Sequence, residues 1–388
     1  MDHIYLDHNA TTPLHPQVLN AMMPYLTNQF GNGSSIHFYG RQVRSAIDKA
    51  REQVANLIGA QNPSEIVFTS GGTESDNHAI KGVALRQKNL LGNHIITTAV
   101  EHSAVLHTCE YLEKHGFEVT YLPVDRHGLI SLNQFQETIQ ENTILTSIMY
   151  VNNEIGTIQS MTNICSIAQD RNITVHTDAV QAIGKIPVDV EDLGVNLLSL
   201  SAHKFYGPKG VGANYVRRRT RLDNFVHGGA QEQNRRAGTE NIAAIVGMGE
   251  AAEIATRDLQ KNSDGITKLT NRLRNGLKGK IEDICENGHS KYIDPGTLSI
   301  SFKSVSGEML LMRLDMEGIC ASSGSACASG SVEPSHVLAK LGLPPEVAQS
   351  TVRFSVGITN TEEQIDETIQ KVTEIVAELR STRNSSWV

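Results

Sequence analysis

Short apolar runs alternate with helix-like stretches over the first two hundred residues, and this alternation constrains the fold more than any other feature of the chain. Six runs have the length and apolar content of buried strands, and segments with helical spacing separate most of them. Such alternation is typical of βαβ units, which build a mainly parallel sheet covered by helices on both faces. The predicted strands are Ile66–Thr69, His94–Thr98, Val119–Leu122, Ile144–Val151, Thr174–Thr177 and Asn196–Leu200.

Helical periodicity supports this interpretation between and after the strands. In Arg41–Gly59 apolar residues recur at helical spacing, and the final glycine is typical of a helix C-terminus. The last predicted helix opens at Thr361, with Gln364 at the spacing of a capping box. Further predicted helices are Ser103–His115, Asn163–Asp170, Ile242–Gln260 and Ile266–Gly279.

The length of 388 residues exceeds what one compact core usually holds. The strand–helix alternation then stops, and helical segments and a Gly/Ser-rich stretch follow. We therefore predict a large domain over residues 15–260 and a smaller domain built from residues 1–14 and 261–388, which carries a loop at about 321–331.

Composition excludes several classes of protein. The net charge of −8 argues against a non-specific binder of nucleic acid, and no apolar run approaches the roughly 18 residues of a membrane span. The N-terminal residues lack a signal-peptide pattern, and five cysteines without a CxxC motif fit a reducing compartment. We expect a cytoplasmic protein. Fifteen histidines without ligand spacing predict no intrinsic metal site.

A Ser-Gly-Gly-Thr turn joins a predicted strand to a predicted helix. Ser70–Thr73 follows the run that ends at Thr69. The N–H groups and positive dipole of a helix start can hold a phosphate, and Thr73 adds a hydroxyl. An ordinary strand–helix connection with a threonine cap explains the turn equally well, so alone it decides nothing.

Asp178 and Lys204 stand at the ends of two other predicted strands. A buried carboxylate is costly unless a positive group meets it, and a desolvated lysine is a good nucleophile toward an aldehyde. The structural alternatives are a helix-capping Asp and a Lys whose amine reaches solvent. A lysine for an aldehyde, an aspartate for a pyridinium nitrogen and a helix start for a phosphate are together what pyridoxal phosphate requires.

Two further polar residues follow predicted strands. His102 could lie over a cofactor ring and move protons, although a histidine at a helix N-terminus is the simpler explanation. Asn153 follows Ile144–Val151, where its amide could reach the phenolic oxygen of the cofactor.

These residues, in this order, resemble the class V, fold-type I pyridoxal phosphate enzymes, and within them the cysteine desulfurases of the NifS/IscS kind. The resemblance runs almost end to end and implies a large domain with a mainly parallel mixed sheet and a smaller α+β C-terminal domain. The matching motifs are Tyr5-Leu6-Asp7-His8-Asn9-Ala10-Thr11-Thr12, Ser70-Gly71-Gly72-Thr73-Glu74, Asn152-Asn153-Glu154-Ile155-Gly156, Thr177-Asp178-Ala179-Val180-Gln181, Ser201-Ala202-His203-Lys204, Arg236-Ala237-Gly238-Thr239-Glu240-Asn241, Ser322-Ser323-Gly324-Ser325-Ala326-Cys327 and Val352-Arg353-Phe354-Ser355.

The resemblance assigns a role to each candidate residue. Lys204 would bond the cofactor aldehyde and Asp178 would pair with the pyridine nitrogen. His102 would stack on the ring as acid and base, and Arg353 would clamp the substrate carboxylate. Gln181 and Asn153 would contact the phenolic oxygen of the cofactor ring, and Asn153 would also contact the substrate. The phosphate would be held by Gly72, Thr73, Ser201 and His203, with Thr239 reaching in from the second subunit of a homodimer.

Cys327 decides the expected reaction. It lies in Ala321–Ser331, eleven residues without a large apolar side chain, so a buried structural cysteine has nothing to pack against there. We therefore predict an exposed nucleophile, whereas the cysteines at 109, 165, 285 and 320 are interpreted as structural.

The predicted function is a desulfurase that converts L-cysteine to L-alanine and leaves a persulfide on Cys327. An Fe–S scaffold of the NifU/IscU kind would accept the sulfur, and Cys327 would be at most a transient cluster ligand shared with it. The alternatives are a selenocysteine lyase, another class V aminotransferase, or a non-catalytic scaffold with this fold. His8 departs from the Asn common in relatives.

Overall fold

The computed structural model describes residues 3–88, 90–323 and 335–385. Its larger sheet has seven strands in the order β2-β8-β7-β6-β5-β3-β4, and β8 alone runs antiparallel to both of its neighbours. The predicted mainly parallel, mixed sheet is therefore confirmed. The strands are β2 (Ile66–Thr69), β3 (His94–Thr98), β4 (Glu118–Leu122), β5 (Thr143–Ser147), β6 (Thr174–Asp178), β7 (Leu197–Ser201) and β8 (Gly212–Val216).

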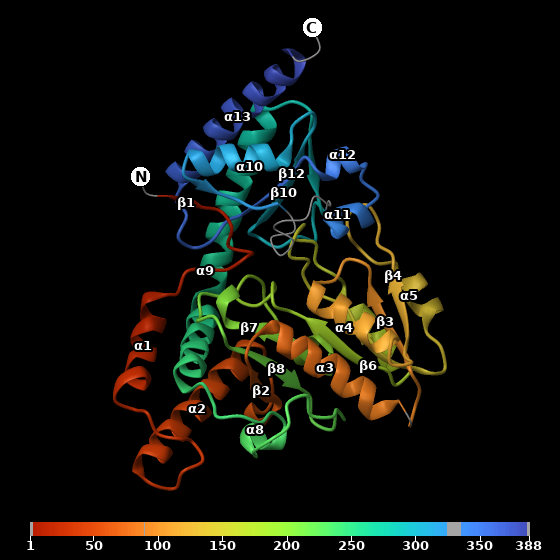
Figure 1. The fold of residues 1–388 in the computed structure, drawn as a ribbon, viewed down its shortest axis with the longest axis vertical. Coiled ribbons are helices and arrows are strands. Elements are labelled where there is room, and N and C mark those ends of the chain that lie inside the picture. The colour runs from red at the N-terminus through yellow and green to blue at the C-terminus, as the bar shows by residue number, and fades with distance from the viewer. Residues whose placement is uncertain (1–2, 89, 324–334, 386–388) are drawn as a thin grey trace.

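Helices cover both faces of this sheet (Figure 1). Alternate residues of a strand enter different cores: Ile66 and Phe68 pack into one apolar cluster, and Val67 packs into another. A strand buried on both faces reads as a continuous apolar run, which is why the sequence revealed it. The helices are α1 (Pro16–Thr27), α2 (Phe38–Leu57), α3 (Gly72–Gln87), α4 (Ser103–Glu113), α5 (Leu132–Thr138), α6 (Met161–Gln169) and the short α7 (Val190–Leu193) and α8 (Gln231–Asn234).

A second, smaller layered unit holds the C-terminal part of the chain. Its antiparallel sheet has the order β12-β10-β9, and the N-terminal strand β1 (Ile4–Tyr5) pairs with β11 (Ile319–Cys320). The other elements are β9 (Ile284–Asn287), β10 (Thr297–Phe302), β12 (Thr351–Ser355), α10 (Gly307–Met316), α11 (His336–Lys340), α12 (Pro345–Ala348) and α13 (Glu362–Ser385).

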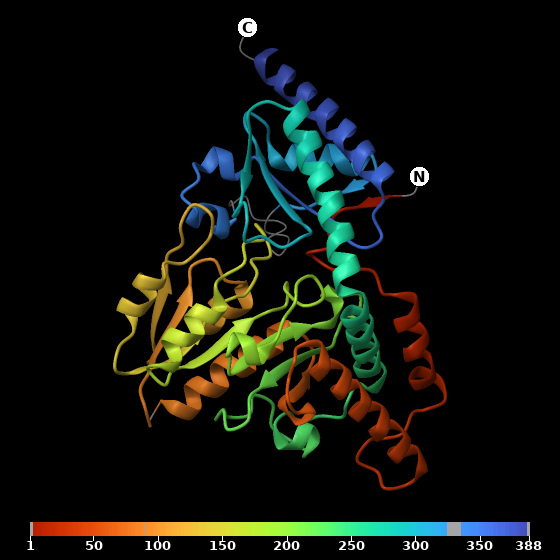
Figure 2. The same cartoon turned by 180° about the vertical axis from the view of Figure 1, so that it is seen from behind.

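One long helix, α9 (Ile242–Lys280), joins the two units (Figure 2). Ile254 and Ala255 belong to the core of the larger unit, and Ile266 and Leu273 belong to the core of the smaller unit. The sequence predicted two helices here, which is wrong: the polar stretch between them is the exposed part of one continuous helix. The predicted domain boundary near residue 260 falls inside α9 and stays a prediction.

The predicted capping box at the start of α13 is present. The Thr361 hydroxyl accepts from the Gln364 backbone N–H at 3.3 Å, and the Gln364 side chain accepts from the Thr361 N–H at 3.3 Å. Among the described residues, no helix is long and apolar enough to cross a membrane.

Candidate active site

A cavity of about 420 Å³ lies at the carboxyl ends of the parallel strands, between the two units. Parallel strands bring their carboxyl ends to one sheet edge, so residues distant in the sequence meet there. Ten of the residues predicted for the site line the cavity: Gly72, Thr73, His102, Asn153, Asp178, Gln181, Ser201, His203, Lys204 and Arg353.

Strands β6 and β7 position Asp178 and Lys204 at the cavity. Asp178 is the last residue of β6, and Lys204 ends the 3-10 turn Ala202–Lys204 that directly follows β7. The two strands pair in parallel with Asp178 opposite Ser199, so both side chains reach the same edge. The Val180 N–H donates to Oδ1 of Asp178 at 2.9 Å, which fixes the carboxylate.

Asp178, His102 and Lys204 interact electrostatically in this cavity. Burial raises the pKa of the Asp178 carboxyl, while His102, the Val180 N–H and Lys204 act in the opposite direction. Burial also lowers the pKa of His102, so its ring is neutral at pH 7. Because Nδ1 of His102 accepts from the Ala104 N–H at 3.1 Å, the neutral ring carries its hydrogen on Nε2.

His102 caps α4, as the simpler explanation predicted, and it also lines the cavity; its role toward a cofactor stays a prediction.

The start of α3 forms a cradle at one wall of the cavity. Gly71, the N-cap residue of α3, has a φ of 153° and makes no side-chain cap hydrogen bond. The first N–H groups of the helix are therefore available to a ligand. A Cβ on Gly72 would come within 2.9 Å of the Val180 Cγ2, so a larger residue would fill the cradle. Thr73 and Ser201 add hydroxyls beside it.

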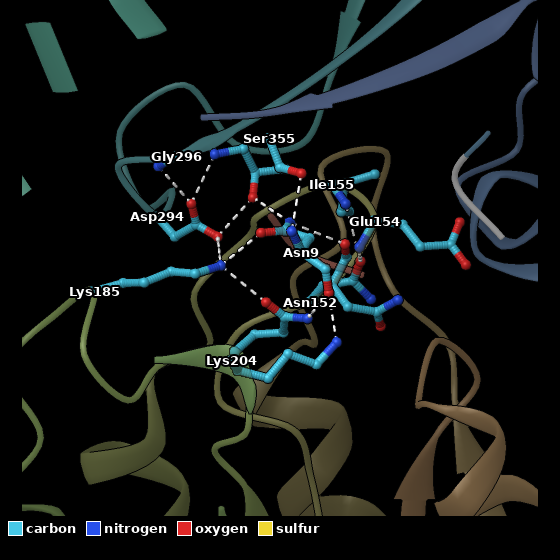
Figure 3. A network of polar contacts seen from close by, with 12 residues as sticks. Asn9, Asn152, Glu154, Ile155, Lys185, Lys204, Asp294, Gly296 and Ser355 are labelled. Atoms are coloured by element: carbon cyan, nitrogen blue, oxygen red, sulfur yellow. Dashed lines mark hydrogen bonds and ion pairs between the residues drawn. The ribbon is translucent and has the colours of Figure 1, made fainter. Parts of the chain in front are cut away.

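The N-terminal segment closes the cavity from the side of the smaller unit. Nζ of Lys204 donates to the backbone oxygen of Asn9 at 2.5 Å (Figure 3) and to that of Ala10 at 2.9 Å. Arg353 lies on β12 and is only 2% exposed. Its Nη1 donates to the backbone oxygen of Asn153 and its Nη2 donates to Oδ1 of Asp7, each at 2.8 Å. Lys204 therefore reaches the cavity from the larger unit and Arg353 reaches it from the smaller unit.

Several residues of the cavity wall were not predicted. Asn9, Asp76, Glu154 and His336 line it, and Asp76 is buried with a pKa raised well above the usual value by burial and then by Asp178. Asp76 lies one turn into α3, four residues after Gly72, and this spacing could have indicated it. Asn9 and His336 reach the wall only through tertiary contacts.

Thr239 is exposed and is not among the residues that line the cavity. Cys327 lies outside the described residues, so its position stays a prediction. The Cys109 and Cys165 side chains are buried, whereas Cys285 and Cys320 are partly exposed.

Comparison with known proteins identifies the class that this fold and cavity define. The profile of the family "Aminotransferase class-V" matches residues 4–368. The chain belongs to this family, and membership of the family implies pyridoxal phosphate as the cofactor.

Individual relatives narrow the class. The chain is 50% identical over 378 residues to "Cysteine desulfurase IscS" of Dictyoglomus turgidum, which covers 97% of this chain and 95% of the relative. A solved "NIFS-LIKE PROTEIN" superimposes with a TM-score of 0.91 at 39% identity, covering 97% of this chain and 99% of that one. "SspA in complex with cysteine" gives a TM-score of 0.82 at 37% identity, covering 92% and 100%. The resemblance to cysteine desulfurases of the NifS/IscS kind is confirmed.

Proposed function

We propose that this chain is a pyridoxal 5′-phosphate-dependent cysteine desulfurase, which converts L-cysteine to L-alanine and leaves the sulfur as a persulfide on Cys327. The observation that carries the proposal is the meeting of an amine, a buried carboxylate, a neutral imidazole and a buried guanidinium around one cavity. The structural relative "SspA in complex with cysteine" supports cysteine as the substrate.

The residues of the cavity fit pyridoxal phosphate. The cradle at the start of α3, which a Cβ on Gly72 would fill, suits a phosphate, with Thr73, Ser201 and His203 beside it. Lys204 is the amine for the aldehyde and Asp178 the carboxylate for the pyridine nitrogen. When bound, the cofactor acts as an electron sink that stabilises negative charge at the substrate Cα.

The protein's own groups would then bind the substrate and move its protons. The guanidinium of Arg353 would hold the substrate carboxylate through two parallel hydrogen bonds. The neutral ring of His102 would exchange a proton at Nε2, because Nδ1 is engaged by the helix α4 backbone. Asn153 and Gln181 would orient the ring oxygen.

Sulfur transfer needs a nucleophile that can reach both the cavity and an acceptor. In the proposed step the Cys327 thiolate attacks the substrate sulfur, the carbon–sulfur bond breaks and the carbon takes up a proton. Cysteine and a thiol thereby give alanine and a persulfide, with no external oxidant. The acceptor would be an Fe–S scaffold of the NifU/IscU kind in the cytoplasm.

A homodimer is part of the proposal. Thr239 is exposed in the single chain, which agrees with a role at a partner subunit's phosphate site.

Borohydride reduction followed by peptide mapping tests the cofactor assignment. The reduced cofactor should be found on the peptide that contains Lys204, and a colourless protein after addition of pyridoxal phosphate would refute it.

Cys327→Ala tests the reaction. We expect alanine and sulfide production from cysteine to collapse while the yellow cofactor stays bound, because the nucleophile is lost and the cofactor contacts are not. Unchanged turnover would favour a selenocysteine lyase or an aminotransferase, and a coloured wild-type protein without alanine production would favour a non-catalytic scaffold.

A further inference from the structure

Lys185 places an ammonium group directly behind the wall of the cavity. Only 8% of this residue is exposed, and it does not line the cavity itself. Its Nζ lies 2.6 Å from Oδ1 of Asn9 and 3.8 Å from Oδ2 of Asp294 (Figure 3). It also lies 2.8 Å from Oε1 of Gln181. Three acceptors thus surround a group that has three N–H bonds and no lone pair.

This arrangement fixes which end of the Gln181 amide faces the cavity. Because an ammonium can only donate, Oε1 of Gln181 must point at Lys185. The Nε2 of Gln181 donates one hydrogen to the backbone oxygen of Asn9 at 2.9 Å. With its oxygen held, the group that Gln181 can offer to a ligand in the cavity is an N–H donor.

The neighbouring Asn9 is oriented in the same way. Its Oδ1 faces Lys185, and its Nδ2 donates to Oγ1 of Thr297 at 2.7 Å and to the backbone oxygen of Asn153 at 3.2 Å. The backbone oxygen of Asn9 that receives Gln181 also receives Nζ of Lys204. Lys185 therefore contacts the cavity wall at two points without entering the cavity.

The charged groups that act on Lys185, Asp294 and Arg353, both belong to the smaller unit. The Asp294 carboxylate is anchored by the Gly296 and Thr297 N–H groups, each at 2.8 Å, and supplies the opposite charge. Burial lowers the pKa of Lys185, with Asp294 acting against this and Arg353 adding to it. Burial lowers the pKa of the nearby His8 to about 4, so that ring is neutral at pH 7.

We propose that Lys185 is a positioning residue, which holds the oxygen of Gln181 out of the cavity so that its N–H meets the phenolic oxygen of the bound cofactor. This inference rests on the proposed function, because it needs pyridoxal phosphate in the cavity. It assigns to Lys185 a role in the electronic state of the cofactor rather than in substrate contact.

The readout is the pH at which the visible absorbance of the bound cofactor changes. A donor at the ring oxygen stabilises the anionic, deprotonated form, so its loss raises this pH. A hydrogen bond to a charged acceptor corresponds to a shift of about one to two units. We expect Lys185→Met to raise the spectral pKa by about that amount, and Lys185→Gln, which keeps a neutral donor, to raise it less.

A double-variant comparison separates positioning from simple loss of charge. If Lys185 acts through the amide, Lys185→Met should cause no further shift in a Gln181→Leu background. A shift of equal size in that background would mean that the ammonium acts through space, and would overturn the proposal. If Lys185→Met is recovered only as aggregate, Lys185→Gln carries the same comparison.

Thr297→Val is the matched control for general loosening of the network. It removes the hydroxyl that bridges Asn9 and Asp294 but leaves the oxygen of Gln181 on Lys185. Its melting temperature should fall while its spectral pKa stays at the wild-type value. A spectral shift in this control, or none in a coloured Lys185 variant, refutes the role of Lys185, whereas a colourless wild-type protein refutes the proposed function instead.

Discussion

Arg353→Lys is the substitution that most directly tests the substrate side of the cavity. The guanidinium has two arms, which donate to the Asn153 oxygen and to Oδ1 of Asp7, and the residue lines the cavity between them. A lysine ammonium is a point charge on a flexible stem and cannot reproduce a planar, two-armed donor. At least one charge-assisted hydrogen bond to a substrate carboxylate should therefore be lost.

The expected magnitude follows from that loss. A hydrogen bond to a charged group contributes about 1.5–3 kcal/mol, which corresponds to a decrease of roughly 10- to 150-fold in kcat/KM for cysteine. The assay compares cysteine with cysteamine, which has the same thiol and amine but no carboxylate. The ratio of the two kcat/KM values should fall by the full factor in the variant, because cysteamine never used the lost bond.

The matched control is Asp7→Asn, which removes the ion pair of Arg353 but keeps the guanidinium. Its ratio of cysteine to cysteamine turnover should stay near that of the wild type. If Arg353→Lys slows both substrates by the same factor, Arg353 shapes the cavity rather than binding the carboxylate, and the assignment of the substrate site is wrong.

Three further variants test stability and proton transfer. Arg51→Met breaks a buried pair in which Nη1 and Nη2 lie 2.6 and 2.7 Å from the Glu232 carboxylate, and urea denaturation should show a loss of about 3–5 kcal/mol in unfolding free energy; a loss below 1 kcal/mol would contradict the buried-pair argument. Burial lowers the pKa of His8 from 6.5 to about 4, so the unfolded chain binds a proton that the folded chain does not, and stability falls as the pH drops from 6.5 to 4. In His8→Asn this decline should be shallower by up to about 1.4 kcal/mol per pH unit, whereas an unchanged slope would show that His8 is not the group responsible. His102→Gln should keep the bound cofactor and lower kcat by roughly 10²- to 10⁴-fold, since it removes the proposed general acid–base group, and a kcat within a few-fold of wild type would exclude that role.

The larger sheet could be predicted because its strands are buried on both faces. The bounds predicted for β2 and β3 agree with the structure, since an apolar run there ends where burial ends. The predicted strand Ile144–Val151 is too long: β5 ends at Ser147, and Val151 instead forms an isolated bridge with Ile158.

Strand β8 was missed. Its residues Gly-Ala-Asn-Tyr-Val follow a glycine-containing turn and form no separate apolar run.

The strands of the smaller sheet were not predicted individually, although the resemblance implied an α+β domain there. Its central strand β10 buries serines and threonines as well as apolar residues, and these polar groups are satisfied by partners on other strands. Oγ of Ser301 lies 2.7 Å from Oγ1 of Thr351, and Nδ2 of Asn287 donates to Oγ of Ser301 at 3.0 Å. Polar and apolar residues alternate strictly in β10, Thr-Leu-Ser-Ile-Ser-Phe, and this is itself a strand pattern, so the strand could have been predicted from the sequence.

Most of the described site residues lie at strand ends or in the turns that follow, whereas Arg353 lies within β12 and the network behind the cavity comes from tertiary contacts. Lys185 is seven residues past β6 and has no pattern of its own, so only the fold brings Asn9 and Asp294 to it.

The junction between the two units owes its geometry to directional bonds as much as to apolar packing. Asn9, from the N-terminal segment, bonds to Lys185 and Gln181 of the larger unit and to Thr297 and Ser355 of the smaller one. An apolar contact tolerates small shifts, but a buried amide with every atom engaged has one orientation in which no polar group loses its partner. A cavity that must bring Lys204 from one unit and the Arg353 guanidinium from the other into a fixed relation therefore gains precision from a polar junction. Removal of Lys185, which contacts two residues of the cavity wall, should disturb the site before it unfolds either core.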